Sequence, residues 1–452
     1  MKGSRVLIIG MGKSGKAVID AALAEGAIVS AMDSKAPGQL DADFIDYLNK
    51  NGVRQYFGIR PDNMSDFDML ILSPGVPPTL DYILEAEESG AEIIGELELA
   101  YRLSKGSFIA ITGTNGKTTT TTLAGEIFKA AGRDTNVAGN IGVAVVTGAR
   151  DSNEDTVLVT EVSSFQLETV KRFRPVVSAI LNLTPDHMDR HKTMENYGRA
   201  KAAIFANQTE EQFCILNYDD KACYELAERE GCNARVVPFS RFEELEFGAF
   251  VKDGNIVIRD DTGKDRVICG TNELKIPGSH NLENALAAAA ITWVTGIDAD
   301  VIGKAMREFS GVSHRIELCC EIDGVRFVND SKGTNPDAAI KAIEAMKENI
   351  ILIAGGYDKG SSYDKFVASF PGRVKALILM GVTAKKIRDA AEAAGFTNIF
   401  DAGNMGECVA QAKEMAEAGD VVLLSPACAS WGMYNNFEER GEDFKSWVRK
   451  LG

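Results

Sequence analysis

The sequence has few of the residues that build disulfide frameworks or metal clusters. Its 452 residues include eight cysteines, which form no CxxC pair and no framework spacing, and only four histidines. A disulfide scaffold is therefore excluded, and we expect eight reduced thiols in a cytosolic protein. The predicted location is the cytoplasm.

The sequence also lacks an excess of positive charge and any long apolar run. Its 49 Lys and Arg stand against 65 Asp and Glu, and the net charge of −16 argues against nucleic acid as the main partner. No apolar stretch is long enough to cross a membrane, and the first one, in MKGSRVLIIGMG, is too short for a signal peptide. The composition is ordinary for a globular protein, and the length predicts about three domains.

The clearest motif is SFIAITGTNGKTTTTTLA, at residues 107–124. A β-like run at 108–111 leads into a glycine turn at 113–118, and a helix is expected from about Thr119. This is the order of a phosphate-binding loop, in which backbone N–H groups face phosphate oxygens. Lys117 would lie at the β- and γ-phosphates, and the Thr118 hydroxyl would bind Mg²⁺. The spacing is shorter than in the usual motif, because Ile111 stands where the first glycine would be. A glycine-rich turn without a ligand is the alternative.

A second glycine motif opens the chain. The buried strand pattern at 5–9 is followed by GMGKSG at 10–15, a helix to Glu25, and a strand that ends at Asp33. GxGxxG between a strand and a helix predicts a dinucleotide or another pyrophosphate at the helix N-terminus, and close helix–strand packing is the alternative. A third strand, at 68–72, meets the rigid turn SPGVPP at the expected ligand edge of the sheet.

Two strand ends in the middle of the chain carry polar groups. The strand at 156–160 delivers Glu161, an expected Mg²⁺ anchor beside a phosphate loop, although an exposed strand-end charge is the alternative. The strand at 177–183 leads to TPDHMDRH, which holds His187 and His191. Zinc is possible there, but the nearby phosphate chemistry favours Mg²⁺. Composition alone makes Lys201, in a helical stretch, a surface lysine.

The rest of the chain continues the alternation of strands and helices. An antiparallel extension is expected over 235–275, and an alanine-rich, tightly packed helix over 282–294 follows an entry with capping groups at 278–281. Beyond 311, strands end in small or polar residues, which predicts a parallel sheet with its ligand loops on one edge. We predict three α/β domains, at 1–95, 96–310 and 311–452.

Five segments together resemble the Mur ligases of peptidoglycan synthesis: GTNGKTT, HMDRH, GSHNLENALAA, SHRIE and NDSKGTNPDA. The resemblance covers essentially the whole chain. GMGKSG, SPGVPP, AGGYDKG and SPACASWGMYNNFEERG are similar to the branch of the family that adds D-glutamate to UDP-N-acetylmuramoyl-L-alanine. The Asp-Asn-Pro-Arg signature of the diaminopimelate- or lysine-adding branch is absent. The fold implied is Rossmann-like at both ends, around a central P-loop ATPase-like parallel sheet.

The resemblance also implies roles for individual residues. The expected contacts of the UDP substrate are Gly12, Lys13, Ser14, Asp33, Ser34, Ser73, Gly75, Asn140 and Ser164. The expected contacts of ATP are Gly113, Thr114, Asn115, Gly116, Lys117, Thr118, Thr119, Asn281, Arg315 and Asp330. The expected contacts of the incoming amino acid are Lys332, Thr334, Lys359, Ser430 and Phe437.

The implied cofactors are two Mg²⁺ ions. Thr118 and Glu161 match the first site and His187 the second, while Lys201 matches a lysine that CO₂ carbamylates, which reverses its interpretation as a surface residue. Lys117, His187 and Lys201 are the expected catalytic residues. The implied reaction is ATP-driven amide formation through an acyl phosphate, by a monomer whose partners are small molecules: ATP, D-glutamate and UDP-N-acetylmuramoyl-L-alanine. The base that deprotonates the amine is unassigned.

Three alternatives stay open at the level of sequence. A sibling ligase that adds L-alanine or a folate glutamate would differ in the loops at 430–437 and at Lys359. A nicotinamide oxidoreductase would account for GMGKSG and Asp33 but not for the phosphate loop. A non-catalytic nucleotide-binding protein would not need Glu161 and His187 together with an intact GKT.

Overall fold

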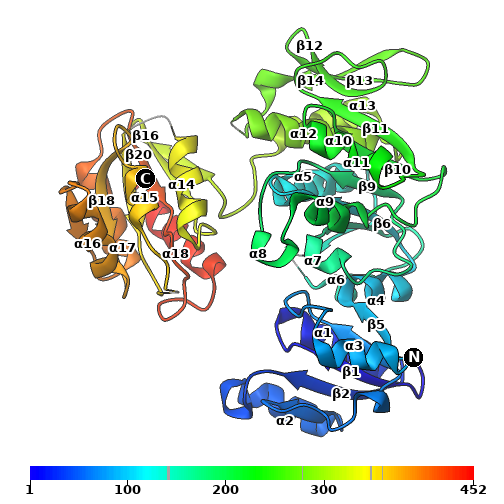
Figure 1. Cartoon of the computed structure of the whole chain (residues 1–452). Coiled ribbons are helices and arrows are strands. Elements are labelled where there is room, and N and C mark those ends of the chain that lie inside the picture. The colour runs from blue at the N-terminus through cyan, green and yellow to red at the C-terminus, as the bar shows by residue number, and fades with distance from the viewer. Residues whose placement is uncertain (140–142, 277, 347–348, 359) are drawn as a thin grey trace. The chain divides into compact units, whose positions relative to one another are not determined.

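The computed structural model describes residues 1–139, 143–276, 278–346, 349–358 and 360–452. Two expected site residues, Asn140 and Lys359, lie outside this part, as does the side chain of Lys13. The chain forms two compact units, Met1–Phe309 and Ser310–Gly452 (Figure 1). A further division of the first unit at residue 95 stays a prediction.

The first sheet is parallel and has the strand order β3-β2-β1-β4-β5. Its strands are β1 Arg5–Ile9, β2 Ile28–Asp33, β3 Arg54–Phe57, β4 Met69–Leu72 and β5 Glu92–Gly95, and its helices are α1 Lys13–Ala24, α2 Ala42–Lys50 and α3 Asp81–Glu88. Alternate residues of β1 point to opposite faces of the sheet. Val6 and Ile8 pack in the apolar cluster that includes side chains of α1, and Leu7 and Ile9 pack in the apolar cluster that includes side chains of α3. The strand order reverses between β1 and β4, so GMGKSG and SPGVPP follow neighbouring strands at the switch point, where open α/β sheets bind ligands.

The second sheet has nine strands in the order β14-β13-β12-β11-β10-β9-β6-β8-β7. They are β6 Ser107–Thr112, β7 Thr135–Gly139, β8 Val157–Glu161, β9 Val177–Ile180, β10 Phe213–Asn217, β11 Arg235–Ser240, β12 Gly248–Lys252, β13 Asn255–Arg259 and β14 Asp265–Gly270. The antiparallel extension is smaller than predicted. Strands β11 and β12 continue the parallel sheet, and only the β12–β13 and β13–β14 pairs are antiparallel.

The helices of this part place the phosphate loop against the sheet. They are α4 Glu96–Leu103, α5 Lys117–Ala130, α6 Val145–Arg150, α7 Ser164–Leu167, α8 Met188–His191, α9 Met194–Ala202, α10 Lys221–Tyr224, α11 Leu226–Arg229, α12 Ser279–Trp293 and α13 Ala299–Glu308. Helix α12 packs on α5, and its run of alanines at 287–290 is buried, as expected of a tightly packed helix. The helix starts earlier than predicted, and its N-cap, Gly278, makes no side-chain capping bond.

The third sheet has the order β15-β16-β20-β17-β18-β19 and is parallel except for the β15–β16 pair. Its elements are β15 Glu317–Ile322, β16 Val325–Asn329, β17 Ile350–Ala354, β18 Val374–Leu379, β19 Ile399–Asp401, β20 Val421–Leu424, α14 Pro336–Ala345, α15 Asp364–Ala368, α16 Ala384–Ala393, α17 Met405–Met415 and α18 Phe437–Arg449. Apolar clusters cover both faces of the sheet, with α14 to α16 on one side and α17 and α18 on the other.

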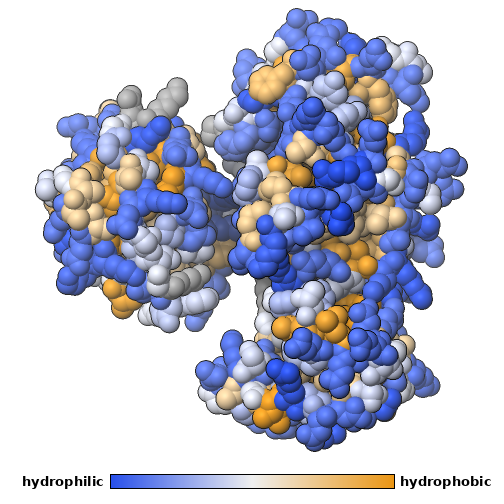
Figure 2. All heavy atoms as spheres, viewed as in Figure 1, coloured by the Kyte–Doolittle hydropathy of each residue, from blue (hydrophilic) through white to orange (hydrophobic). Residues whose placement is uncertain are grey.

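The visible face of each unit is mostly hydrophilic, with apolar residues in small groups (Figure 2). Among the described residues, no helix has both the length and the apolar character that crossing a bilayer requires.

Candidate active site

The loop between β6 and α5 has the geometry of an anion site. Gly116 is the N-cap of α5 with φ 83°, in the left-handed region that glycine adopts freely, and a Cβ there would lie 2.1 Å from Oδ1 of Asn284. The loop therefore requires glycine, and it directs the first N–H groups of a 14-residue helix outward. Lys117 folds back over the loop, and its Nζ donates to the main-chain oxygens of Gly113 and Thr114, each at 2.9 Å.

Strand register brings an acidic group to this loop. In the parallel pair of β6 and β8, Ile111 lies opposite Glu161, so the carboxylate emerges where the loop begins. The Thr118 hydroxyl donates to Oε2 of Glu161 at 2.8 Å, and both residues are only 5% exposed. A hydroxyl and a carboxylate are hard oxygen donors of the kind that Mg²⁺ prefers, so this pair fits the expected first Mg²⁺ site. In the described part of the chain, no group of three or more His, Cys, Asp or Glu residues could hold a metal by itself.

Lys201 is buried beside the same loop, so its interpretation from composition as a surface lysine is wrong. It is 1% exposed, and its Nζ donates to the main-chain oxygen of Gly113 at 2.9 Å and lies 3.4 Å from Oγ1 of Thr112. It also lies 4.6 Å from the ring centroid of Tyr197, one turn earlier in α9. Burial, assisted by the charge of Lys117, lowers the pKa of Lys201 to about 7.

The two histidines of the HMDRH segment lie in different surroundings. His187 is the N-cap of α8 with φ 54°, and its side chain is 49% exposed. His191, at the end of α8, is buried, and its Nε2 lies 2.9 Å from Oγ of Ser164, an expected contact of the UDP substrate. Burial lowers the pKa of His191. The rings of both histidines pack against Phe165.

The expected UDP-substrate loops are joined by hydrogen bonds between side chains and the main chain. Ser73 Oγ donates to the Gly10 oxygen at 2.7 Å, and Oδ2 of Asp33 accepts from the N–H of Met11 at 2.7 Å. The close-packing alternative applies to Gly15, where a Cβ would lie 2.5 Å from the Gly10 oxygen. A Cβ on Gly12 or Gly75 would instead face open space. The exposed Ser34 follows Asp33, and Ser14 is half-buried in the first turn of α1.

The loops of the C-terminal unit gather at the strand ends of β16 and β20. Asp330 is buried, and its Oδ2 accepts from Ser425 Oγ at 2.7 Å. Burial raises the pKa of Asp330 to about 7. Lys332 Nζ lies 5.9 Å from the ring centroid of Phe437, which begins α18, while Ser430 is buried. Arg315 is exposed and Thr334 is half-buried.

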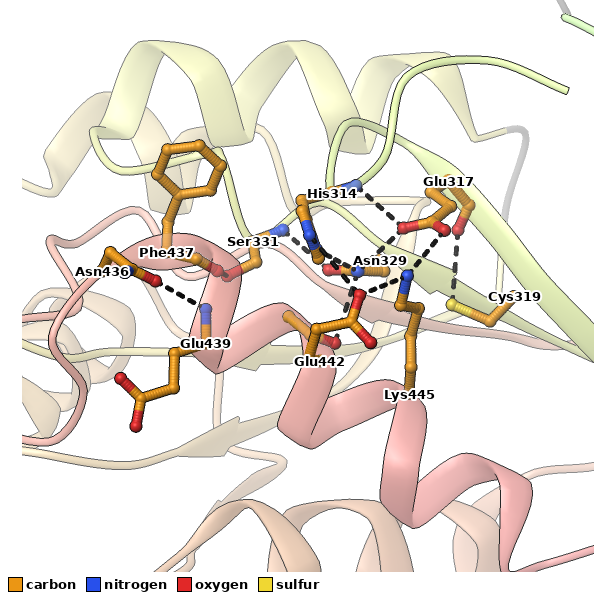
Figure 3. A network of polar contacts seen from close by, with 11 residues as sticks. His314, Glu317, Cys319, Asn329, Ser331, Asn436, Phe437, Glu439, Glu442 and Lys445 are labelled. Carbon is orange, nitrogen blue, oxygen red and sulfur yellow. Dashed lines mark hydrogen bonds and ion pairs between the residues drawn. The ribbon is translucent and has the colours of Figure 1, made fainter. Parts of the chain in front are cut away.

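A polar network holds these loops on α18 (Figure 3). Ser331 Oγ donates to the Phe437 main-chain oxygen at 2.7 Å, and Nδ1 of His314 lies 3.0 Å from Nδ2 of Asn329. The His314 ring stands edge-on to Phe437, with centroids 6.1 Å apart. The network therefore links the segment before Arg315 to an expected amino-acid contact.

Sequence reasoning missed Arg440, which is 1% exposed. Its guanidinium makes two hydrogen bonds to Ser331: Nε donates to Oγ at 3.0 Å, and Nη2 donates to the main-chain oxygen at 2.8 Å. The third nitrogen, Nη1, donates to the main-chain oxygen of Cys428 at 3.1 Å. It thus joins α18 to the loops that carry Lys332 and Ser430. An arginine in a charged helix is normally exposed, so no local signal indicated this role.

Comparison with known proteins agrees with this geometry along the chain. Residues 4–95 match the Mur ligase MurD-like N-terminal domain, 111–292 the Mur ligase middle domain, and 314–428 the Mur ligase glutamate ligase domain. The chain belongs to the Mur ligase family. The resemblance inferred from the sequence motifs and the predicted fold class are thereby confirmed.

Individual relatives within this family are enzymes that share one name. The chain is 50% identical to the UDP-N-acetylmuramoylalanine--D-glutamate ligase of Thermoanaerobacter sp. (strain X514), over 100% of this chain and 99% of the relative. It is 48% identical to the ligase of the same name from Clostridioides difficile (strain 630), with the same coverage.

Solved structures of the family share the fold. The UDP-N-acetylmuramate-alanine ligase MurC of Thermotoga maritima matches with a TM-score of 0.58 and 19% identity, over 99% of this chain and all of that one. The MurF ligase of the same organism, in complex with ADP, matches with a TM-score of 0.54 and 16% identity, over 100% and 96%. A nicotinamide oxidoreductase would leave the middle and C-terminal matches unexplained.

Proposed function

We propose that this protein is an ATP-dependent ligase that joins D-glutamate to UDP-N-acetylmuramoyl-L-alanine in peptidoglycan precursor synthesis. The observation that carries the proposal is the 50% identity, over the full chain, to ligases named for that reaction. The phosphate loop, with a buried hydroxyl–carboxylate pair and two lysines beside it, supports ATP as the energy source.

The proposed assignment of substrates follows the three sheets. Residues 1–95 would bind the UDP part of the substrate, 96–310 ATP, and 311–452 the amino acid, through the contacts that the sequence predicts. Residues 113–119 would hold the phosphates, with N–H groups of the loop directed at their oxygens. The Ser73–Gly10 hydrogen bond would keep two nucleotide loops in register at the sheet edge.

The chemistry begins with the carboxylate of the L-alanyl group, a poor electrophile. Transfer of the γ-phosphoryl group of ATP to this carboxylate gives an acyl phosphate and ADP. The amine of D-glutamate then attacks the acyl carbon, the amide bond forms, the amine loses a proton, and inorganic phosphate leaves. Lys117 would offset negative charge on the transferred group, and the loop would hold donor and acceptor oxygens in line.

Mg²⁺, when bound, supplies positive charge that neutralises the phosphate oxygens. Thr118 and Glu161 would hold one ion, and His187 with a carbamylated Lys201 the other. A lysine with its pKa lowered to about 7 is substantially neutral at neutral pH, and only the neutral amine reacts with CO₂. We propose that the enzyme acts as a cytoplasmic monomer on small molecules.

Phosphate release from ATP tests the proposal, with Mg²⁺ and UDP-N-acetylmuramoyl-L-alanine present and D- and L-amino acids offered in turn. We expect release that requires D-glutamate. Release with another acceptor would identify a sibling ligase. No release with any acceptor would overturn the assignment of the UDP substrate.

A further inference from the structure

Arg190, in the short helix α8, forms a bridge that the sequence did not indicate. Its side chain is 16% exposed, and Nε and Nη2 donate to the two carboxylate oxygens of Glu168. The adjacent edge of the guanidinium faces SPGVPP, where Nη1 lies 3.3 Å from the Pro74 oxygen and Nη2, which also donates to Glu168, lies 3.5 Å from the Val76 oxygen. One side chain therefore connects the second sheet to a loop of the first.

The place where Arg190 contacts this loop is specific. The two accepting carbonyls flank Gly75, an expected contact of the UDP substrate, and a Cβ on Gly75 would face open space. Arg190 thus holds the main chain on both sides of Gly75 without covering it. The loop in turn supports GMGKSG, through the hydrogen bond from Ser73 to the Gly10 oxygen.

The same guanidinium also packs on Phe165 of α7, a ring that contacts His187, the N-cap of the helix that carries Arg190. Its Cζ lies 4.5 Å from the ring centroid of Phe165, and the centroid of the His187 ring lies 4.8 Å from that of Phe165, so one ring contacts both residues. Glu168, the partner of Arg190, follows α7, which begins at Ser164. Movement of the loop around Gly75 would therefore displace groups beside the phosphate loop.

We infer that Arg190 is a positioning residue that couples the loop around Gly75 to the segment of His187, and so aligns the UDP substrate with the phosphoryl donor. The inference rests on the proposed function. Arginine suits the task because its planar fork can donate to two carboxylate oxygens and two carbonyls at once, whereas a lysine has only three donors on a single nitrogen.

The test compares full-length wild type with Arg190→Lys and Arg190→Ala. Arg199→Ala is the matched control, since Arg199 lies on the neighbouring helix α9 with its side chain 60% exposed, in an ion pair with Glu195. Equilibrium binding of UDP-N-acetylmuramoyl-L-alanine and of ADP is measured separately, and KM is measured for each substrate. We expect both Arg190 variants to bind the UDP substrate about tenfold more weakly or worse, as loss of hydrogen bonds from a charged group implies, with ADP binding and the control unchanged.

The outcomes separate this inference from the proposed function. Wild type that does not bind the UDP substrate would contradict the proposed function itself. Wild type that binds it, with Arg190→Lys showing equal affinity and an unchanged KM, would overturn the role of Arg190. Equal losses for ADP and the UDP substrate would also overturn it, because they indicate general damage. If Arg190→Ala does not fold, Arg190→Lys decides, since it keeps the charge and much of the stem.

Discussion

Lys201 and Lys117 donate hydrogen bonds to the same atom, the main-chain oxygen of Gly113, and each does so at 2.9 Å. Two lysine side chains converge on one carbonyl because α9 and the first turn of α5 both face the loop. Their mutual repulsion adds to the burial of Lys201 in lowering its pKa. The lowered pKa favours the neutral amine, which is the form that the proposed carbamylation requires.

Replacing Lys117 by Ala should abolish turnover, because charge on the transferred phosphoryl group would no longer be offset. We expect phosphate release to fall by about a hundredfold or more. Lys221→Ala, at a side chain that is 87% exposed, is the control and should retain full activity. Release at the wild-type rate in Lys117→Ala would refute the assignment of the phosphate loop.

Lys201→Ala should lose activity and regain part of it when short carboxylic acids are added. A small carboxylate could occupy the space of the proposed carbamate, because Lys201 is enclosed and the shorter side chain leaves a cavity. Phosphate release measured against acetate or propionate concentration checks this. Normal activity of the variant without any added acid would show that Lys201 has no catalytic role.

Asp330 should make stability depend on pH. Its folded-state pKa is raised to about 7 from 3.8, so between these values the native state binds more protons than the unfolded state. Stability should therefore fall as pH rises from about 4 to about 7, by on the order of 2–4 kcal/mol, and then level off. Urea unfolding of wild type and Asp330→Asn at each pH measures the difference in their free energies of unfolding. If Asp330 titrates normally, this difference should not change between about pH 4 and about pH 7.

Glu98, which is not among the expected site residues, should contribute strongly to stability. Its carboxylate is fully buried and accepts from the N–H groups of 171–173 and from Nε of Arg102. Glu98→Gln would place an amide NH₂ against these donors and leave Arg102 partly unpaired, so we expect a loss of about 3 kcal/mol in the free energy of unfolding. Glu195→Gln, in an exposed pair, should change it by less than about 0.5 kcal/mol. Equal losses in the free energy of unfolding for Glu98→Gln and Glu195→Gln would show that burial of the carboxylate does not determine its contribution to stability.

The parts of the fold that could be predicted have strong local signals. The runs at 5–9, 108–111 and 350–353 are long and apolar enough to specify buried strands, and glycine turns mark where they end. The short strands β3, β5 and β19 were missed because three or four residues give no clear period. In helix α4 both Glu96 and Glu98 are buried, which no local signal in the sequence indicates.

The sequence by itself determined the order of the α/β segments and the chemistry of the glycine loops, because those depend on neighbours along the chain. Only the tertiary structure decided the burial of Lys201, the carboxylate site of Glu98 and the bridges made by Arg190 and Arg440. Each of these charged side chains would be solvated in a helix considered alone. Most of their partners are main-chain groups or side chains supplied by other segments, which parallel strand order and helix packing bring together.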